Sequence, residues 1–295
     1  GRNFIDLEDF NNNEIRQILN HAIEIKSKLI DYRKSLYLKS LGILFEKKSL
    51  RTKVSFDVAM KNMGGNVIEL DPKSIGFGTR ESDSDIIKIL SQYIDCLVVR
   101  NKDHEKIKML SNCSQLSIIN GLSDYSHPCQ SLSDIFTIQE IKGGSIEDKL
   151  IVWCGDVTNV LRSLLQLSKI IGFSLNLALP EQIIEVNEMY LDKYKSDKVK
   201  ICGDPFEAVE NADCIMTDVW FSMGEKRSEE KLKLMKDYQI NEKLMKRAKD
   251  SAIFMHCLPA IRNEEVTDSI IDGKTSVVWQ QAQNRIYVQQ SILSY

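Results

Sequence analysis

The sequence lacks long apolar runs, a strong excess of charge and a dinucleotide-binding fingerprint, and each absence excludes a class of protein. No apolar stretch approaches the ~20 residues that are needed to cross a bilayer, so we expect no membrane span. The formal net charge is -3, which gives no reason to expect nucleic acid or an anionic membrane as partner. The G-x-G-x-x-G pattern is absent, which argues against a nicotinamide-dependent dehydrogenase.

The cysteines and histidines also lack the spacing of metal ligands. The chain has seven cysteines, which is an odd number. They are far apart and no CxxC pair occurs, which is typical of reduced cysteines in the cytoplasm. The four histidines are isolated from one another as well: His21, His104, His127 and His256. We therefore expect a cytoplasmic protein that holds no metal and needs no cofactor.

The residues that are present fit a globular α/β protein of two domains. A chain of 295 residues with 43% hydrophobic and 27% charged residues is long enough for two cores of ordinary size. Short β-branched runs alternate with helical stretches, as in parallel sheets that are covered by helices. The expected strands fall in two series, around 42–45, 66–70, 96–100 and 117–120, and then around 150–154, 174–179, 198–202, 213–217, 252–256 and 276–279.

The best candidate for a linker is the KGGS segment at residues 142–145. We therefore place a first domain at residues 1–144 and a second domain at residues 145–279, each a parallel sheet flanked by helices. Connecting helices join them, one of them at residues 129–141. The last helix, residues 280–295, has no following strand, and we expect it to pack back on the first domain.

The segment from Phe45 to Gly65 carries the clearest chemical signal, because a helix begins near Ser49 directly after a strand and a polar turn. A helix start attracts anions, Ser49 and Thr52 add hydroxyl groups, and Arg51 adds a planar fork that suits phosphate oxygens. This predicts a small phosphorylated ligand. An ordinary N-cap with a solvated arginine fits the same residues. Three side chains are expected on the apolar face of this helix: Val54, Val58 and Ala59.

Ligands of parallel sheets bind beyond the carboxyl ends of the strands, so the loops there are candidate sites. Arg100 ends one strand of the first domain, where it could meet a ligand or simply reach solvent. His127 precedes Pro128 at a helix start, and its ring could donate to a carbonyl oxygen, hold a phosphate, or only cap and pack.

Three loops of the second domain carry further candidates. Asn159 opens a helix after a strand and could offer its amide to a polar substrate or cap that helix. Asp218 follows another strand and could accept an ammonium group, with Ser222 adding a hydrogen bond, or it could form a turn. Cys257 ends a strand and could be activated by a basic pocket or be an inert packing residue.

Together and in this order, these motifs resemble the aspartate/ornithine carbamoyltransferase family, and within it the ornithine branch. The resemblance runs from about Phe4 to the C-terminus. The family motifs are S-x-R-T at Ser49–Thr52, the strand-ending Arg100 and HPCQ at His127–Gln130, and those of the ornithine branch are DVWFSMG at Asp218–Gly224 and HCLP at His256–Pro259.

The resemblance implies transfer of the carbamoyl group of carbamoyl phosphate to the side-chain amine of L-ornithine, giving L-citrulline and phosphate for arginine biosynthesis. It implies that carbamoyl phosphate is bound by Ser49, Leu50, Arg51, Thr52, Arg100, His127, Gln130, Cys257, Leu258 and Arg285. It implies that ornithine is bound by Asn159, Asp218, Ser222 and Met223. The residues implied for catalysis are Arg51, Arg100, His127, Asp218 and Cys257. It also implies a homotrimer and a cis peptide bond before Pro259.

Several positions depart from the family pattern, and we expect them to change the affinity for carbamoyl phosphate rather than the reaction. They are Leu50 for threonine, Lys53 for arginine, Gly76 for a glutamine that relatives supply from a neighbouring subunit, Val157-Thr158 for Gly-Asn, and Gln281 and Gln283 for acids. Two alternatives stay open at this point. The chain could carbamoylate putrescine or another amine, or it could be a catalytically weakened paralogue with a structural role.

Overall fold

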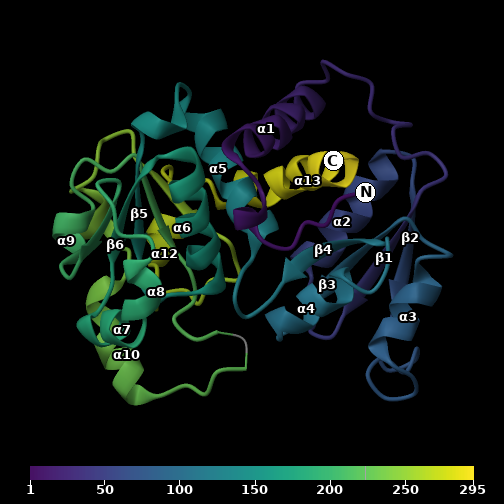
Figure 1. Ribbon diagram of the computed structural model, residues 1–295. Coiled ribbons are helices and arrows are strands. Elements are labelled where there is room, and N and C mark those ends of the chain that lie inside the picture. The colour runs from purple at the N-terminus through teal and green to yellow at the C-terminus, as the bar shows by residue number, and fades with distance from the viewer. Residues whose placement is uncertain (223) are drawn as a thin grey trace. The chain divides into compact units, whose positions relative to one another are not determined.

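The computed structural model describes residues 1–222 and 224–295 (Figure 1). The chain divides into two units, the first made of residues 1–133 and 283–295 and the second of residues 134–282. Each unit holds one sheet in which all paired strands are parallel and which helices flank. This confirms the predicted fold class. The division falls within two helices, α5 (Pro128–Lys142) and α13 (Val278–Ser294).

The first unit has a four-stranded sheet in the order β2-β1-β3-β4. Its strands are β1 (Ser40–Phe45), β2 (Asn66–Leu70), β3 (Cys96–Arg100) and β4 (Ser117–Leu122). Its helices are η1 (Leu7–Asp9), α1 (Asn12–Lys26), α2 (Arg51–Asn62), α3 (Asp83–Leu90) and α4 (His104–Ser111). The end of α13 lies beside α1, where the Ser291 hydroxyl donates to the Ile18 carbonyl at 2.7 Å (Figure 1).

The second unit has a five-stranded sheet in the order β7-β6-β5-β8-β9. Its strands are β5 (Leu150–Cys154), β6 (Ser174–Ala178), β7 (Val199–Cys202), β8 (Cys214–Thr217) and β9 (Ile253–His256). Its helices are η2 (Ile146–Asp148), α6 (Asn159–Ile171), α7 (Glu181–Val186), α8 (Glu188–Asp192), α9 (Pro205–Ala208), α10 (Glu229–Met235), η3 (Lys236–Tyr238), α11 (Glu242–Met245) and α12 (Asp268–Ile271).

Both sheets change the direction of their strand order at one point, and this places the loops that can hold ligands. In the first sheet β1 pairs with both β2 and β3, and in the second β5 pairs with both β6 and β8. The crevice beyond the carboxyl ends of the two strands at such a point is the usual ligand site. The loops after β1 and β3, and those after β5 and β8, are therefore candidate ligand-binding loops.

The predicted strand at residues 276–279 is wrong. Ser276 forms only an isolated bridge to Phe254, and Val278 already begins α13. The segment is rich in β-branched and aromatic residues, which favour strands locally. Burial of Val278 against the core of the second unit outweighs that preference.

The predicted apolar faces of two helices are partly wrong. In α1 the helical spacing of the sequence predicts a core face of Ile15, Ile18, Leu19, Ala22 and Ile23; the first four are buried, whereas Ile23 is 44% exposed. In α2 Val54 is 49% exposed, and the buried residues are Thr52, Ser55, Phe56, Ala59 and Met60. The helix is thus rotated so that a hydroxyl of its first turn points inward.

A membrane-spanning helix would need a long apolar stretch, and none of the helices in the described part of the chain has one.

Candidate active site

The turn between β1 and α2 leaves the start of α2 without a side-chain cap. Leu50 is the N-cap residue, and no side chain hydrogen-bonds to the first turn. The Ser49 hydroxyl is instead 3.2 Å from the Nη1 atom of Arg100, which donates to it. The alternative in which Ser49 is an ordinary N-cap of this helix is therefore wrong. The first N–H groups of α2 remain available to an anion.

Three arginines, which we call the arginine cluster, gather around Thr52: Arg51, Arg100 and Arg285. Arg100 and Arg285 donate to the buried Thr52 hydroxyl from Nη1 at 3.5 Å and from Nη2 at 3.1 Å. Arg100 is 7% exposed, and among the described residues it forms no ion pair with a carboxylate. Burial, Arg285 and Arg51 lower the pKa of Arg100 to about 10, so it stays charged at neutral pH.

Like charges that are buried together destabilise one another unless an anion joins them. The Nε atom of Arg100 is buried without a hydrogen-bond partner among the described residues. An anion with several oxygens would relieve the repulsion and accept from this group. The arginine cluster and the start of α2 therefore have the charge and the hydrogen-bond donors that would suit a phosphate-sized anion.

His127 lies beside the arginine cluster, and burial together with the charges of the cluster keeps its imidazole neutral. The side chain is 5% exposed, and it directly precedes α5. Burial, together with the charges of Arg285 and Arg100, holds the pKa of His127 well below its ordinary value. A neutral imidazole can still donate one hydrogen bond, so it can polarise a carbonyl oxygen without carrying a charge of its own.

The other residues of the HPCQ motif fill the first turn of α5. Gln130 is 1% exposed, and its backbone N–H donates to the His127 carbonyl at 3.1 Å. Cys129 is a core residue whose Sγ lies 3.6 Å from the carbonyl of Asn120, and burial raises its pKa to about 12. Cys129 is thus inert, whereas Gln130 lies in the first turn of α5 and is joined to His127, the residue before the helix, by this hydrogen bond.

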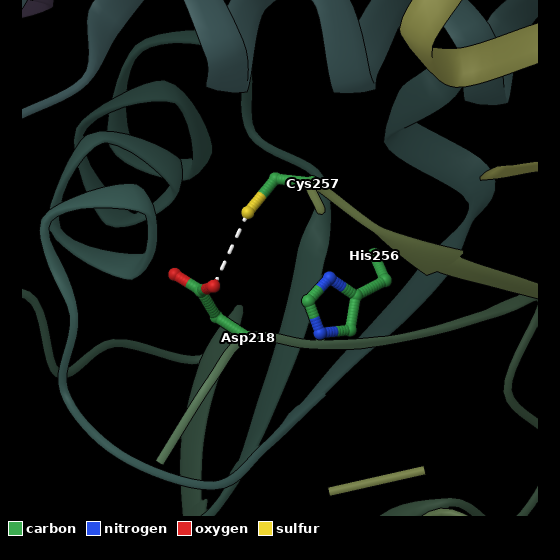
Figure 2. A group of neighbouring side chains, drawn as sticks. All are labelled: Asp218, His256 and Cys257. Carbon is green, nitrogen blue, oxygen red and sulfur yellow. Dashed lines mark hydrogen bonds between the residues drawn. The ribbon is translucent and has the colours of Figure 1, made fainter. Parts of the chain in front are cut away.

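In the second unit, strand register brings Asp218 and Cys257 together. Thr217 of β8 is the partner of His256 in β9, so the residues that follow both strands are neighbours. The Sγ atom of Cys257 donates to Oδ1 of Asp218 at 3.2 Å (Figure 2). Both side chains are half-buried. A carboxylate next to a thiol is suited to an amine, which needs acceptors for its protons.

Asp218, His256 and Cys257 also have ligand atoms within 4.8 Å of one another, the spacing of a metal site. However, Nδ1 of His256 accepts from the Leu258 N–H at 2.9 Å, and Nε2 lies 2.9 Å from Oε1 of Glu265. Both ring nitrogens are therefore engaged. His256 would have to give up one of these hydrogen bonds before it could bind an ion.

The loop after β9 has the backbone that the resemblance implies. The peptide bond between Leu258 and Pro259 is cis, which confirms that prediction, and Leu258 has a φ of 61°. A non-glycine residue in the left-handed region persists only where its surroundings hold it. The hydrogen bond from Leu258 to His256 is one such restraint.

Asn159 and Ser222, two further candidates of the second unit, follow the carboxyl ends of β5 and β8. Asn159 is the first residue of α6, but the N-cap is Thr158, whose hydroxyl accepts from the Leu161 N–H, so capping by Asn159 is wrong. Ser222 is exposed, and its backbone N–H donates to Glu225 at 2.9 Å. Met223 lies outside the described residues, and its predicted role stays a prediction.

The structure gives several departures from the family pattern a local role. Thr158 caps α6, as above. Gln281 accepts from the His256 N–H at 2.9 Å and donates to Asp134 at 2.8 Å, which an acid could not do. Lys53 pairs with Glu69 on β2. At Gly76, with a φ of 69°, an added Cβ would lie 2.6 Å from the Cβ of Arg80, so the loop has no room for a side chain there.

Comparisons with known proteins agree with this geometry. Residues 2–140 match the family domain described as "Aspartate/ornithine carbamoyltransferase, carbamoyl-P binding domain", and residues 147–295 match its "Asp/Orn binding domain". An ornithine carbamoyltransferase of Rhodopseudomonas palustris (strain BisA53) is 40% identical over 303 residues, which cover 100% of this chain and 96% of the relative. The chain belongs to the aspartate/ornithine carbamoyltransferase family.

Solved structures of this carbamoyltransferase family share the fold over the whole chain. The ornithine carbamoyltransferase of Pyrococcus furiosus is 39% identical, with a TM-score of 0.89 over 99% of this chain and 96% of that chain. The anabolic ornithine carbamoyltransferase of Campylobacter jejuni is 32% identical, with a TM-score of 0.88 over 99% of this chain and 98% of that chain.

Sequence reasoning missed two charged residues of this carbamoyltransferase that lie beside the candidate loops, Asp156 and Lys231. Their side chains are 16% and 17% exposed, and Lys231 Nζ lies 2.6 Å from Oδ2 of Asp156. A lysine in the first turn of a helix, as in α10, is opposed by the helix dipole. The unfavourable placement of Lys231 in the first turn of α10 is the sequence signal that could have indicated its role.

Proposed function

We propose that this chain transfers the carbamoyl group of carbamoyl phosphate to the side-chain amine of L-ornithine, giving L-citrulline and phosphate in arginine biosynthesis. The observation that carries the proposal is the arginine cluster around Thr52 with neutral His127 beside it. Three cationic groups suit a phosphate, and a neutral donor next to them suits a carbonyl oxygen.

The roles of the first unit follow from charge and hydrogen-bonding capacity. The start of α2, with Ser49, the backbone of Leu50, Arg51 and Thr52, would hold the phosphate oxygens. Arg100 and His127 would donate to the carbamoyl oxygen, and Gln130 and Arg285 would orient the rest of the group: both are almost fully buried. Negative charge grows on that oxygen when an amine attacks the carbamoyl carbon, so donors fixed in advance lower the barrier.

The roles of the second unit follow from the Asp218–Cys257 pair. The carboxylate and the thiol would receive the side-chain amine, while Asn159, Ser222 and Met223 would hold the α-amino acid end. The backbone of Cys257 and Leu258 would add contacts to the carbamoyl group. The amine attacks in its neutral form, the tetrahedral intermediate collapses, and phosphate leaves and can accept the surplus proton. No covalent intermediate is needed.

Assembly and compartment belong to the same proposal. We expect a homotrimer, because the resemblance that supplies the residue roles also implies one. We expect a cytoplasmic enzyme, because no disulfide joins the cysteines of the described residues, as is typical of proteins in a reducing compartment.

A citrulline assay with purified protein tests the proposal. We expect citrulline to form from carbamoyl phosphate and L-ornithine, and no product of comparable rate from putrescine or L-lysine. Product from putrescine but not from ornithine would make the chain an amine carbamoyltransferase. No product from any amine, together with no calorimetric binding of carbamoyl phosphate at millimolar concentration, would make it a weakened structural paralogue.

A further inference from the structure

One lysine of the second unit joins the two loops that carry candidate amino-acid contacts. The Nζ atom of Lys231 lies 2.6 Å from Oδ2 of Asp156, in the turn between β5 and α6, and 2.6 Å from Oε1 of Glu225, in the loop after β8. The lysine side chain is 17% exposed. Asn159 begins α6 at the end of that turn, three residues after Asp156, and Asp218 and Ser222 precede Glu225 on the loop after β8.

Both carboxylates that bind Lys231 are themselves fixed to the backbone of their loops. Oδ1 of Asp156 accepts from the Val157 N–H at 2.6 Å, and the Asp156 carbonyl accepts from the Trp153 indole at 2.9 Å. Glu225 and Ser222 exchange two hydrogen bonds, each of 2.9 Å, one through the glutamate side chain and one through its backbone N–H. A shift of Lys231 would therefore move backbone and not only side chains.

The surroundings of Lys231 make these two ion pairs firmer than surface pairs. Burial acts to lower the lysine pKa, but the hydrogen bonds to Asp156 and Glu225 outweigh it, and the net shift is upward. The ammonium group also lies 5.1 Å from the ring centre of Phe221, on the same loop as Glu225, and Arg227 lies 4.9 Å from that centre. The lysine holds this position although it lies in the first turn of α10, where a helix dipole disfavours a cation.

We propose that Lys231 is a positioning residue for the amino-acid substrate: it sets the separation between the loop of Asp218 and Ser222 and the turn of Asn159. The inference rests on the proposed function, because these two loops are the ones that would hold ornithine. Lys231 need not touch the substrate. Its removal should weaken binding of the amino acid and leave the anion site of the first unit unchanged, since that site takes its phosphate contacts from other elements.

The test compares the KM for ornithine and the KM for carbamoyl phosphate in Lys231→Met and in two companion variants. Lys231→Met keeps the aliphatic chain and removes the charge, and we expect the KM for ornithine to rise about tenfold or more, the loss of one or two charge-assisted hydrogen bonds. We expect the KM for carbamoyl phosphate to stay within twofold. Lys231→Arg should recover most of the ornithine affinity, and Lys233→Met, on the exposed side of α10, should match wild type.

A second readout excludes a merely structural effect. L-Norvaline keeps the α-amino acid end of ornithine and lacks the attacking amine, so its inhibition constant reports positioning without chemistry. We expect Lys231→Met to weaken norvaline as much as ornithine while the affinity for carbamoyl phosphate is kept, even though the two carboxylates left without their cation lower the thermal midpoint. If Lys231→Met does not fold, Glu225→Gln takes its place, because it removes only one of the two pairs, and a severalfold rise in the KM for ornithine is then expected.

Unchanged ornithine and norvaline constants in the variant, or an equal rise in both substrate KM values, would overturn the role of Lys231 and leave the proposed function intact. Wild-type protein that makes no citrulline would overturn both. The two failures are thus distinguished by the wild-type assay alone.

Discussion

The two units meet opposite chemical demands with opposite constructions. In the first unit several candidate side chains are deeply buried, with Thr52 1%, Arg285 3% and His127 5% exposed, and the charged members of the site are all arginines. In the second unit the candidates lie on loops, Asp218 is half-buried and Ser222 is exposed. A site for a fixed anion gains from charges that are held rigid and dry, whereas a site for a flexible amino acid uses loops that ion pairs restrain.

The comparison also shows where strain is stored. The first unit holds its strain as repulsion among the arginine cluster, which lowers the pKa of Arg100 through burial, Arg285 and Arg51. The second unit holds a left-handed Leu258 next to Cys257. Anion binding would relieve the first kind of strain, so the first unit should bind its ligand tightly without help from the second.

The largest expected effect comes from removing an arginine from the anion site of the first unit. Arg51→Ala should lower kcat/KM for carbamoyl phosphate about 10²-fold or more, because an arginine fork makes up to two charge-assisted hydrogen bonds worth about 1.5–3 kcal/mol each. Steady-state kinetics with saturating ornithine measure this, and circular dichroism checks the fold. Lys61→Ala, an exposed cation at the far end of the same helix, is the matched control and should stay within threefold of wild type. Activity of Arg51→Ala within a few-fold of wild type would remove this residue from the site.

A smaller effect is expected from removing the charge of Asp218, which should change the affinity for ornithine alone. Asp218→Asn should raise the KM for ornithine about 10–100-fold, the loss of one charge-assisted contact of about 1.5–3 kcal/mol. The KM for carbamoyl phosphate should hardly change. Asp237→Asn, an exposed carboxylate of the same unit, is the control. If Asp218→Asn weakened both substrates alike, the division of labour between the units would be wrong.

The smallest effect is a pH dependence of stability from His127. Its pKa in the folded protein lies well below the ordinary value of 6.5 because of burial, Arg285 and Arg100. The unfolded chain therefore takes up a proton as the pH falls below about 6.5 while the folded chain does not, so the stabilising contribution is present above that pH and is lost below it.

The limit of this contribution is about 1.4 kcal/mol per pH unit for one proton. Denaturant unfolding of wild type and of His127→Asn between pH 7.5 and 5.5 measures it. We expect the wild-type free energy of unfolding to fall more steeply toward low pH than that of the variant. Equal slopes for wild type and His127→Asn would show that His127 is not buried as a neutral group.

The sequence predicted the strands well because short β-branched runs alternate with helices, and nine strands lie where they were expected. It failed at 276–279, where local preference for a strand gives way to tertiary burial of Val278. It also failed at Val54, because the rotation of α2 is set by what packs beneath it. Helical periodicity alone does not specify that rotation.

The candidate site was predictable in its members but not in its contacts. Thr52 and Arg285 are 233 residues apart in the sequence, and the return of α13 to the first unit joins them. Asp218 and Cys257 meet because β9 pairs with β8, and strand order cannot be read from the sequence. Lys231 was missed because its importance lies in joining two loops, and no motif records that.

The most direct test of the account is a calorimetric titration of a stable carbamoyl phosphate analogue, with a methylene group in place of the bridging oxygen, without ornithine. The account predicts that wild type and Asp218→Asn bind it with the same affinity, and that Arg51→Ala binds it at least about 10²-fold more weakly. Equal binding by Arg51→Ala and wild type, or a loss of binding in Asp218→Asn, would contradict the claim that the first unit alone provides the anion site.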